Sequence, residues 1–281
     1  MRVLDRVDVV RKELETARAG GRTVGLVPTM GALHEGHGSL IRRSAAERDL
    51  TVVTVFVNPL QFGPTEGFTR YPRDRDADAS AAAGWGAELL FAPPVEEMFP
   101  DQPVTRVEVA GLSESLEGAA RPGHFRGVVT IVAKLFAIAG RCRAYFGEKD
   151  YQQLLVVRRM AADLSFPVDV VACPTVREPD GLACSSRNAY LSPAERRAAT
   201  VLHRSLVSAA DAVSRGELDA VRLRAVMAEV VEAEPLARLD YAEVADPATL
   251  APLETVRGEV RLLVAAWVGS TRLIDNMGVS E

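Results

Sequence analysis

The 281-residue sequence has only three cysteines, Cys142, Cys173 and Cys184. The number is odd, and no two of them form a Cys-x-x-Cys pair, so the sequence argues against both a disulfide framework and a zinc knuckle. We therefore expect reduced thiols that serve mainly in packing. That usage is typical of a protein in a reducing cytoplasm.

The sequence also lacks long apolar runs and an excess of basic residues. No run approaches the roughly 18 apolar residues of a membrane span, and the first eight residues, MRVLDRVD, are charged rather than signal-like. Lysine and arginine number 33 against 38 acidic residues, which gives a formal charge of -5 and no visible basic stripe. We therefore expect a cytoplasmic protein without membrane or nucleic-acid partners.

What the sequence does contain is the pattern of an α/β protein. With 48% hydrophobic and 25% charged residues, its length suits one large or two medium domains. A strand at 23–27, the helix after it and the β-branched run 50–57 form a βαβ unit, which predicts a parallel sheet with helices on both faces. Pro174 follows the last strand expected in this sheet. We therefore expect one domain at 1–174 and a smaller α+β cap domain at 175–281.

Periodicity and turn residues predict the remaining elements. Helices are expected at 7–19, 74–83, 112–118, 128–139, 151–164 and 218–233. A capping box with proline at the first helical position, SPAE at 192–195, predicts one long helix towards Arg215. Further strands are expected at 88–92, 104–109, 143–146, 168–173, 239–244, 261–267 and 271–276. The segment 58–64 is expected to be a loop, because its prolines cannot continue a ladder.

The segment TMGALHEGH at 29–37 lies between the first of these strands and its helix. In such a unit the backbone N–H groups of the turn and the positive helix end point at one spot, which favours an anion. His34 and His37 can both reach a phosphate there. A zinc site is disfavoured, because these histidines are three apart whereas His-Glu-x-x-His places them four apart. A purely structural histidine pair stays open, and the turn alone does not decide.

Three further segments carry polar residues where a ligand could bind. Asn58 and Gln61 follow a strand at the carboxyl-end edge of the sheet, where open parallel sheets bind ligands; turn formation explains Asn58 equally well, whereas Gln61 favours a ligand. The segment 147–150, GEKD, repeats the strand–turn–helix arrangement with Lys149 at the turn, although a solvated charge run is the commoner explanation. The segment 184–187, CSSR, offers several phosphate donors, but a plain surface loop is the alternative.

In their order along the chain, these segments resemble the pantothenate synthetase family of the nucleotidylyltransferase superfamily. The resemblance spans residues 28 to 191 and rests on PTMGALHEGH at 28–37, FVNPLQFG at 56–63, YPR at 71–73, GHFRGV at 123–128, FGEKDYQQ at 146–153 and SSRN at 185–188. It implies a Rossmann-like nucleotidylyltransferase domain followed by the smaller domain. It also implies an enzyme that joins (R)-pantoate to β-alanine through a pantoyl adenylate, using ATP and releasing AMP and pyrophosphate.

The resemblance also assigns roles to individual residues. It implies His37 as proton donor, and we expect the catalytic set to be His34, His37, Lys149 and Arg187, donors placed in advance for negative charge. Gln61 and Gln153 match positions that hold pantoate, and Gln61 also lies by β-alanine. The implied ATP-binding residues are Met30, Gly31, Ala32, Leu33, His34, Glu35, Gly36, His37, Gly147, Glu148, Lys149, Asp150, Val176, Cys184, Ser185, Ser186 and Arg187.

Mg²⁺ is expected as the partner of ATP, and the resemblance implies a homodimer. Protein ligands for the metal are not indicated, because Asp76 and Asp78 are separated by Ala77 where some family members have consecutive acidic residues. Two further departures from the family are Gly38, in place of a larger apolar residue at a cost of up to about 1 kcal/mol in helix propensity, and Cys184, in place of methionine.

Two other functions stay open at this stage. Another nucleotidyl or adenylyl transferase of the superfamily would share both phosphate-binding segments, but it would not need Gln61 and Gln153 to face a small hydroxy acid. A non-catalytic nucleotide sensor would be expected to lose a histidine or the lysine. His34, His37 and Lys149 are all present.

Overall fold

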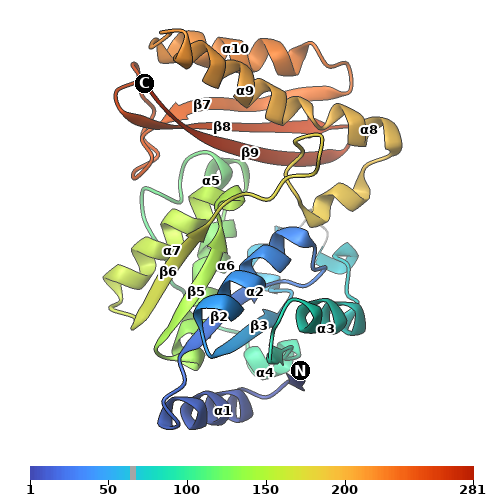
Figure 1. Cartoon of the computed structure of the whole chain (residues 1–281), viewed down its shortest axis with the longest axis vertical. Coiled ribbons are helices and arrows are strands. Elements are labelled where there is room, and N and C mark those ends of the chain that lie inside the picture. The colour runs from blue at the N-terminus through green and yellow to red at the C-terminus, as the bar shows by residue number, and fades with distance from the viewer. Residues whose placement is uncertain (64–67) are drawn as a thin grey trace. The chain divides into compact units, whose positions relative to one another are not determined.

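The computed structural model describes residues 1–63 and 68–281 (Figure 1). The predicted loop 58–64 is therefore described as far as Gly63, and Pro64 lies outside the described residues. The chain forms two compact units, the first of Met1–Glu148 and Gln152–Pro174, the second of Lys149–Tyr151 and Thr175–Glu281. The domain boundary between residues 174 and 175 stays a prediction, because compactness alone does not show that either part folds by itself.

The first unit is built on a six-stranded parallel sheet. Its strands are β1 (Arg2–Leu4), β2 (Val24–Thr29), β3 (Leu50–Val55), β4 (Leu89–Phe91), β5 (Cys142–Gly147) and β6 (Val168–Cys173). They lie in the order β1-β4-β3-β2-β5-β6, and every pairing is parallel. Val27, Val53 and Leu90 are completely buried, as expected for strands covered on both faces. The predicted parallel α/β fold is confirmed.

Helices and short 3-10 turns connect these strands. The helices are α1 (Val7–Ala19), α2 (Glu35–Glu47), α3 (Arg75–Gly84), α4 (Val95–Met98), α5 (Glu117–Ala120), α6 (His124–Ala139) and α7 (Tyr151–Asp163), and the turns are η1 (Pro59–Gln61), η2 (Phe68–Arg70) and η3 (Glu148–Asp150). Parallel crossovers are right-handed, so α2 and α3 lie on one face of the sheet, and α1, α6 and α7 lie on the other. In agreement, α2 contacts α3 and α1 contacts α6.

The direction of winding reverses between β2 and β5, which are neighbours in the sheet. In open parallel sheets, ligands bind beyond the carboxyl ends of the strands at such a reversal. Strand β2 leads into the histidine turn, and β5 leads into Glu148. The topology of the first unit thus selects these two strand ends as the place to look for a ligand site.

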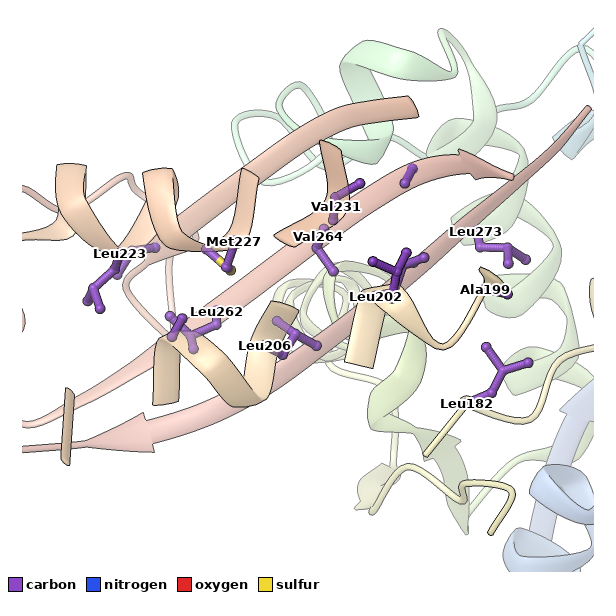
Figure 2. Packing of buried hydrophobic residues seen from close by; sticks show 14 of the residues in the cluster. Leu182, Ala199, Leu202, Leu206, Leu223, Met227, Val231, Leu262, Val264 and Leu273 are labelled. Carbon is purple, nitrogen blue, oxygen red and sulfur yellow. The ribbon is translucent and has the colours of Figure 1, made fainter. Parts of the chain in front are cut away.

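The second unit is a three-stranded antiparallel sheet covered on one side by helices. Its elements are η4 (Ser186–Tyr190), α8 (Pro193–Ala198), α9 (Val201–Ser214), α10 (Ala220–Glu232), β7 (Ala237–Ala245), β8 (Glu259–Val268) and β9 (Thr271–Ser280). Alternate residues of β8, such as Leu262 and Val264, point at Leu206 of α9 and Met227 of α10, and all four are completely buried (Figure 2). This is the smaller α+β part that the sequence predicts after Pro174.

The predicted strand at 104–109 is wrong. A strand needs a backbone partner, but the Val107 N–H donates to the Thr130 hydroxyl of α6 at 3.0 Å, and Val104 is 93% exposed. The predicted helix at 112–118 is also displaced, because the helix formed in this region is α5, which begins at Glu117. The carbonyls of Leu112 and Ser115 accept from the Gln152 side chain, each at 2.8 Å.

The single long helix predicted from Ser192 is interrupted. The capping box is present, with the Ser192 hydroxyl accepting from the Glu195 N–H and the Glu195 carboxylate accepting from the Ser192 N–H. Beyond α8, however, the Thr200 hydroxyl donates to the Arg197 carbonyl at 2.8 Å. In a continuous helix the Arg197 carbonyl would accept from the Val201 N–H. The Thr200 hydroxyl competes for that carbonyl, and α9 starts separately at Val201.

Candidate active site

The turn between β2 and α2 contains the predicted histidine motif and has an unusual backbone. Gly31 and Ala32 have φ angles of 86° and 52°, in the left-handed region that favours glycine. The Gly31 N–H donates to the Thr29 hydroxyl at 3.2 Å, and the Gly31 carbonyl accepts from the Tyr71 hydroxyl at 3.3 Å. An alanine in this conformation is strained, so the surrounding contacts must hold it.

Asp78 of α3 provides those contacts. Its carboxylate accepts from the Leu33 N–H at 2.8 Å and from the Ala32 N–H at 3.1 Å, and the residue is 4% exposed. Burial raises the pKa of Asp78, and the two N–H donors oppose that rise. The expectation that the turn's backbone N–H groups bind an external anion is therefore wrong for Ala32 and Leu33, because a carboxylate of the protein already accepts from both.

His34 and His37 stand together at the start of α2. Their ring centroids are 4.1 Å apart. His34 Nδ1 accepts from the Gly36 N–H at 3.2 Å, and His37 Nδ1 accepts from the His34 N–H at 3.3 Å, so each ring caps the helix start. A ring nitrogen that accepts carries no proton, which assigns the proton of each neutral ring to Nε2. In both rings Nε2 is therefore a donor, as a site for phosphate oxygens requires.

Gln61 of η1 lies against this turn. It is 7% exposed, and its side-chain amide donates to the Met30 sulfur at 2.7 Å. The structure thus brings together Met30 and Gln61, predicted to contact ATP and pantoate. Asn58, which is 1% exposed, caps η1 by accepting from the Leu60 N–H and donates to the Gln61 side-chain carbonyl. The turn explanation for Asn58 is therefore correct, and Asn58 orients the Gln61 amide as well.

His124 also orients Gln61, through its backbone. The ring lies 2.9 Å from the Gln61 carbonyl at Nδ1 and 2.9 Å from an Arg121 nitrogen at Nε2. Because arginine can only donate, Nε2 accepts and Nδ1 donates to the carbonyl. Sequence reasoning gave His124 no role, although it lies in a matched block. Being one of four histidines in the chain was the available signal.

The neighbouring glutamines of α7 differ in what they contact. Gln152 is 3% exposed and makes hydrogen bonds to the Leu112 and Ser115 carbonyls and to the Glu117 N–H. Gln153 is half-buried, and its amide has no hydrogen bond within the described part of the chain. Gln152 therefore holds the loop before α5, which leaves Gln153 as the glutamine with an amide available to a ligand, as the pantoate prediction requires.

In the second unit, Lys149 and Ser185 of the serine–arginine segment both line a small cavity. Asn188 and Asp275 are among the other residues that line it. The Lys149 side chain is 15% exposed, and its ammonium group lies 3.6 Å from the Asp150 carboxylate. Ser185 caps η4 by accepting from the Arg187 N–H at 3.3 Å. Lys149 and Ser185, whose side chains carry the ammonium and hydroxyl groups that commonly bind phosphate, thus lie close together.

The remaining predicted ATP-binding residues differ in what they contact. Glu35 is exposed, and its carboxylate pairs with the Arg42 guanidinium of the same helix. The Cys184 N–H donates to the Val176 carbonyl at 2.9 Å, which joins the two ends of the loop 176–184. The Arg187 guanidinium makes no ion pair with any described residue. Gly147, Glu148 and Asp150 lie at the end of β5 and in η3.

Asp76 and Asp78 do not form a metal-binding pair. Asp78 is occupied by two backbone N–H groups, and Asp76 is exposed in the first turn of α3. Within residues 1–63 and 68–281, no three histidine, cysteine, aspartate or glutamate side chains converge as metal ligands. Over the same residues, no helix has both the length and the apolar character needed to cross a membrane.

The parallel sheet is doubly wound, and two histidines cap the helix that follows the strand at its reversal point. These features define a class, the nucleotidylyltransferase-like α/β proteins. The sequence model of one family, described as pantoate-beta-alanine ligase, matches residues 2–278. The chain belongs to the pantoate–beta-alanine ligase family and is a ligase.

Individual relatives agree with the family match. A pantothenate synthetase of Moorella thermoacetica is 52% identical over 99% of this chain and 98% of the relative. The crystal structure of pantothenate synthetase from Thermus thermophilus has a TM-score of 0.95 and 49% identity over the full length of both chains. A pantoate-beta-alanine ligase from Francisella tularensis, described as complexed with beta-gamma ATP and beta-alanine, has a TM-score of 0.80 and 30% identity, covering 99% of this chain and 97% of that one.

Proposed function

We propose that this protein joins pantoate to β-alanine at the expense of ATP, through an enzyme-bound pantoyl adenylate. The observation that carries the proposal is the pair His34 and His37, which cap α2 through Nδ1 and so have Nε2 as the donor nitrogen of both rings. Gln61 is held beside the same turn. Family membership and the related structure described with ATP and β-alanine support it. Accordingly, this chain uses ATP, and we propose the following role for each residue.

In the first step, a carboxylate oxygen of pantoate attacks the α-phosphorus of ATP. The bond between that phosphorus and the α,β-bridging oxygen breaks, and pyrophosphate leaves. Negative charge grows on the α-phosphate and on the leaving group, so donors fixed in advance lower the barrier. His34 and His37 donate through Nε2, Lys149 supplies a point charge, and Arg187 supplies a planar fork of donors.

The other ATP contacts of the proposal come from residues 30–37, residues 147–150, Val176 and residues 184–187. Gln61 and Gln153 hold pantoate through their amides. In the second step the neutral amine of β-alanine, placed near Gln61, attacks the carbonyl of the adenylate. The carbon–oxygen bond to AMP breaks, AMP leaves, and the nitrogen loses a proton.

Mg²⁺ accompanies ATP in this proposal. Its preference for oxygen ligands and for retained waters suits binding through the nucleotide's phosphates rather than through a dedicated set of carboxylates. The bonding of Asp78 to backbone N–H groups supports this division, since that carboxylate is already satisfied. Chelation with excess EDTA should therefore abolish AMP formation, and added Mg²⁺ should restore it without refolding.

The test of the proposed function is AMP release by the purified protein with magnesium-ATP, pantoate and β-alanine, each omitted in turn. We expect release to require all three substrates, with pantothenate formed in equal amount. Release that needs neither pantoate nor β-alanine, or no release from folded protein, would contradict the assignment of substrates. In that case another adenylyl transfer of the superfamily would be the chemistry to test.

A homodimer working in the cytoplasm is the assembly we propose. A symmetric dimer is the commonest assembly of a soluble chain, and the buried thiols of Cys142, Cys173 and Cys184 suit a reducing compartment. Sedimentation velocity should give twice the mass of the chain. A species at the chain mass over the whole micromolar range would contradict the dimer.

A further inference from the structure

Strand β9 carries two adjacent polar residues, Asp275 and Asn276, in the interior of the second unit. Each is 4% exposed. Buried polar groups in folded proteins are hydrogen-bonded, so the partners of these two residues report what the strand is holding in place. Those partners come from two segments far apart in sequence, around Lys149 and around Arg177.

Asn276 holds the Lys149 segment. Its side-chain nitrogen donates to the Lys149 carbonyl at 2.9 Å, and its side-chain oxygen accepts from Arg261 Nε at 2.8 Å. The Arg261 guanidinium in turn lies over the Tyr151 ring, 3.9 Å from its centroid. The Tyr151 hydroxyl donates to the Pro247 carbonyl at 2.8 Å. The backbone at Lys149 and the ring two residues later are therefore both fixed.

Asp275 holds the loop that ends in the serine–arginine segment. Its two carboxylate oxygens accept from the two terminal nitrogens of Arg177 at 2.6 and 2.9 Å, and Arg177 also donates to the Gly181 carbonyl at 3.1 Å. Arg177 and Ala183 form an antiparallel bridge. The bidentate pair thus fixes a narrow hairpin, and Ser185 follows directly after it.

The two held segments are those assigned to phosphate binding. Lys149, Ser185 and Asp275 line the same small cavity. A lysine on a four-carbon stem and an arginine in a surface turn lose much conformational freedom when they bind a phosphate, so fixing their backbones in advance lowers that cost. Two buried side chains, adjacent on one rigid strand, fix both backbones.

We propose that Asp275 and Asn276 are positioning residues for adenylation: Asn276 sets the Lys149 backbone, and Asp275, through Arg177, sets the loop that carries Ser185 and Arg187. The inference rests on the proposed roles of Lys149 and Arg187 in the first step. It assigns neither residue a contact with substrate. The effect should therefore appear in the rate of adenylate formation and not in the binding of pantoate.

The decisive variant is Asn276→Asp. It keeps an oxygen for Arg261 but replaces the donor to the Lys149 carbonyl with a second oxygen. Asn276→Ser removes the same donor without adding charge, and so covers the case in which the aspartate variant fails to fold. Asp240→Asn is the matched control, because Asp240 of β7 pairs with Arg272 of β9 in the same sheet but contacts neither phosphate-binding segment.

We expect both Asn276 variants to lower kcat for AMP formation by roughly 3- to 10-fold, the effect of losing one hydrogen bond, with KM for pantoate unchanged and Asp240→Asn at the wild-type rate. The residue acts through Lys149, so in a Lys149→Ala background the same substitutions should lower the remaining rate no further.

A wild-type kcat in folded Asn276→Asp, or a loss of the same factor with and without Lys149, would overturn the inference. These results differ from failure of the proposed function. If wild-type protein forms no AMP, or if Lys149→Ala is fully active, the proposed role of Lys149 is contradicted, and so is the positioning role of Asn276 that depends on it.

Discussion

His37 has two tasks that a single substitution removes together. Its Nδ1 accepts from the His34 N–H, and its Nε2–H is the proposed donor to a phosphate oxygen. We predict that His37→Ala lowers the single-turnover rate of adenylate formation by about 10²-fold or more, the loss typical of one preorganised donor. Asp76→Asn, an exposed site on α3, should react at the wild-type rate. Equal rates for His37→Ala and wild type would remove the histidine pair from catalysis.

The adjacent glutamines of α7 should respond oppositely to the same change. Gln153→Ala should raise KM for pantoate and leave the melting temperature unchanged, because its amide has no hydrogen bond among the described residues. Gln152→Ala should lower the free energy of unfolding by about 2–4 kcal/mol, because three hydrogen bonds to the loop before α5 are lost. Steady-state kinetics and urea unfolding of both variants check this, and an unchanged pantoate KM in Gln153→Ala would exclude it from the site.

Single residues could be predicted where their partners are close in sequence. His34 and His37 share one turn, so their spacing predicts that the two rings lie together, as they do. Asp78 binds that turn from 46 positions further along the chain, and no local pattern distinguishes it from Asp76. The same holds for Asn276, 127 positions from Lys149. Contacts of this kind depend on the sheet order, which periodicity does not give.

At the scale of elements, α2 depends on a glycine that propensity alone would disfavour. A Cβ added to Gly38 would lie 2.6 Å from the Trp85 ring at the end of α3. We predict that Gly38→Ala lowers the free energy of unfolding by about 1–3 kcal/mol through overpacking, which exceeds the gain of up to about 1 kcal/mol in helix propensity. Urea unfolding measures the difference.

Gly84→Ala is the matched control for this prediction, because nothing lies within 4 Å of an added Cβ there. It should be neutral or stabilising by up to about 1 kcal/mol. A stabilised Gly38→Ala would show that the Trp85 ring moves aside. The family departure at Gly38 therefore has a packing reason that only the position of Trp85 reveals.

The elements with strong local signals were predicted closely. Helix α6 is apolar over most of its length and ends at Ala139 as predicted, although it begins at His124 rather than at Val128. The capping box correctly predicts where α8 starts, but not where it ends. The strand at 104–109 failed because alternation of apolar residues does not guarantee a neighbouring strand to pair with. Strand β1 was missed because three residues are too few for any period to show.

At the scale of the whole molecule, each compact unit has its own hydrophobic core. Val27, Ile41 and Tyr145 belong to the core of the first unit, and Leu206 and Val264 to that of the second. The fold class and this division follow from hydrophobic patterning, because burial of apolar surface dominates folding. The placement of the proposed phosphate-binding residues depends instead on a few polar contacts, which patterning does not determine.

A buried histidine in the second unit should make the stability of the whole protein depend on pH. His203 of α9 packs against Gly181 in the loop held by Arg177, and its Nδ1 is buried without a hydrogen-bond partner in the described part of the chain. Burial lowers the pKa of His203 below its ordinary value of 6.5, and the Arg177 charge lowers it further, whereas Asp275 opposes the shift. The folded protein therefore resists protonation at this site more than the unfolded chain does.

The sign of the effect follows from which state binds the proton. Between the lowered pKa and 6.5 the unfolded chain binds more protons, so the stability that His203 contributes is fully present above about pH 6.5 and is lost as pH falls through the lowered pKa. His203→Gln cannot titrate, so its melting temperature should fall less than that of wild type between pH 7 and pH 5. Parallel curves for the two proteins would show that other groups control the acid sensitivity, and that the buried ring does not resist protonation.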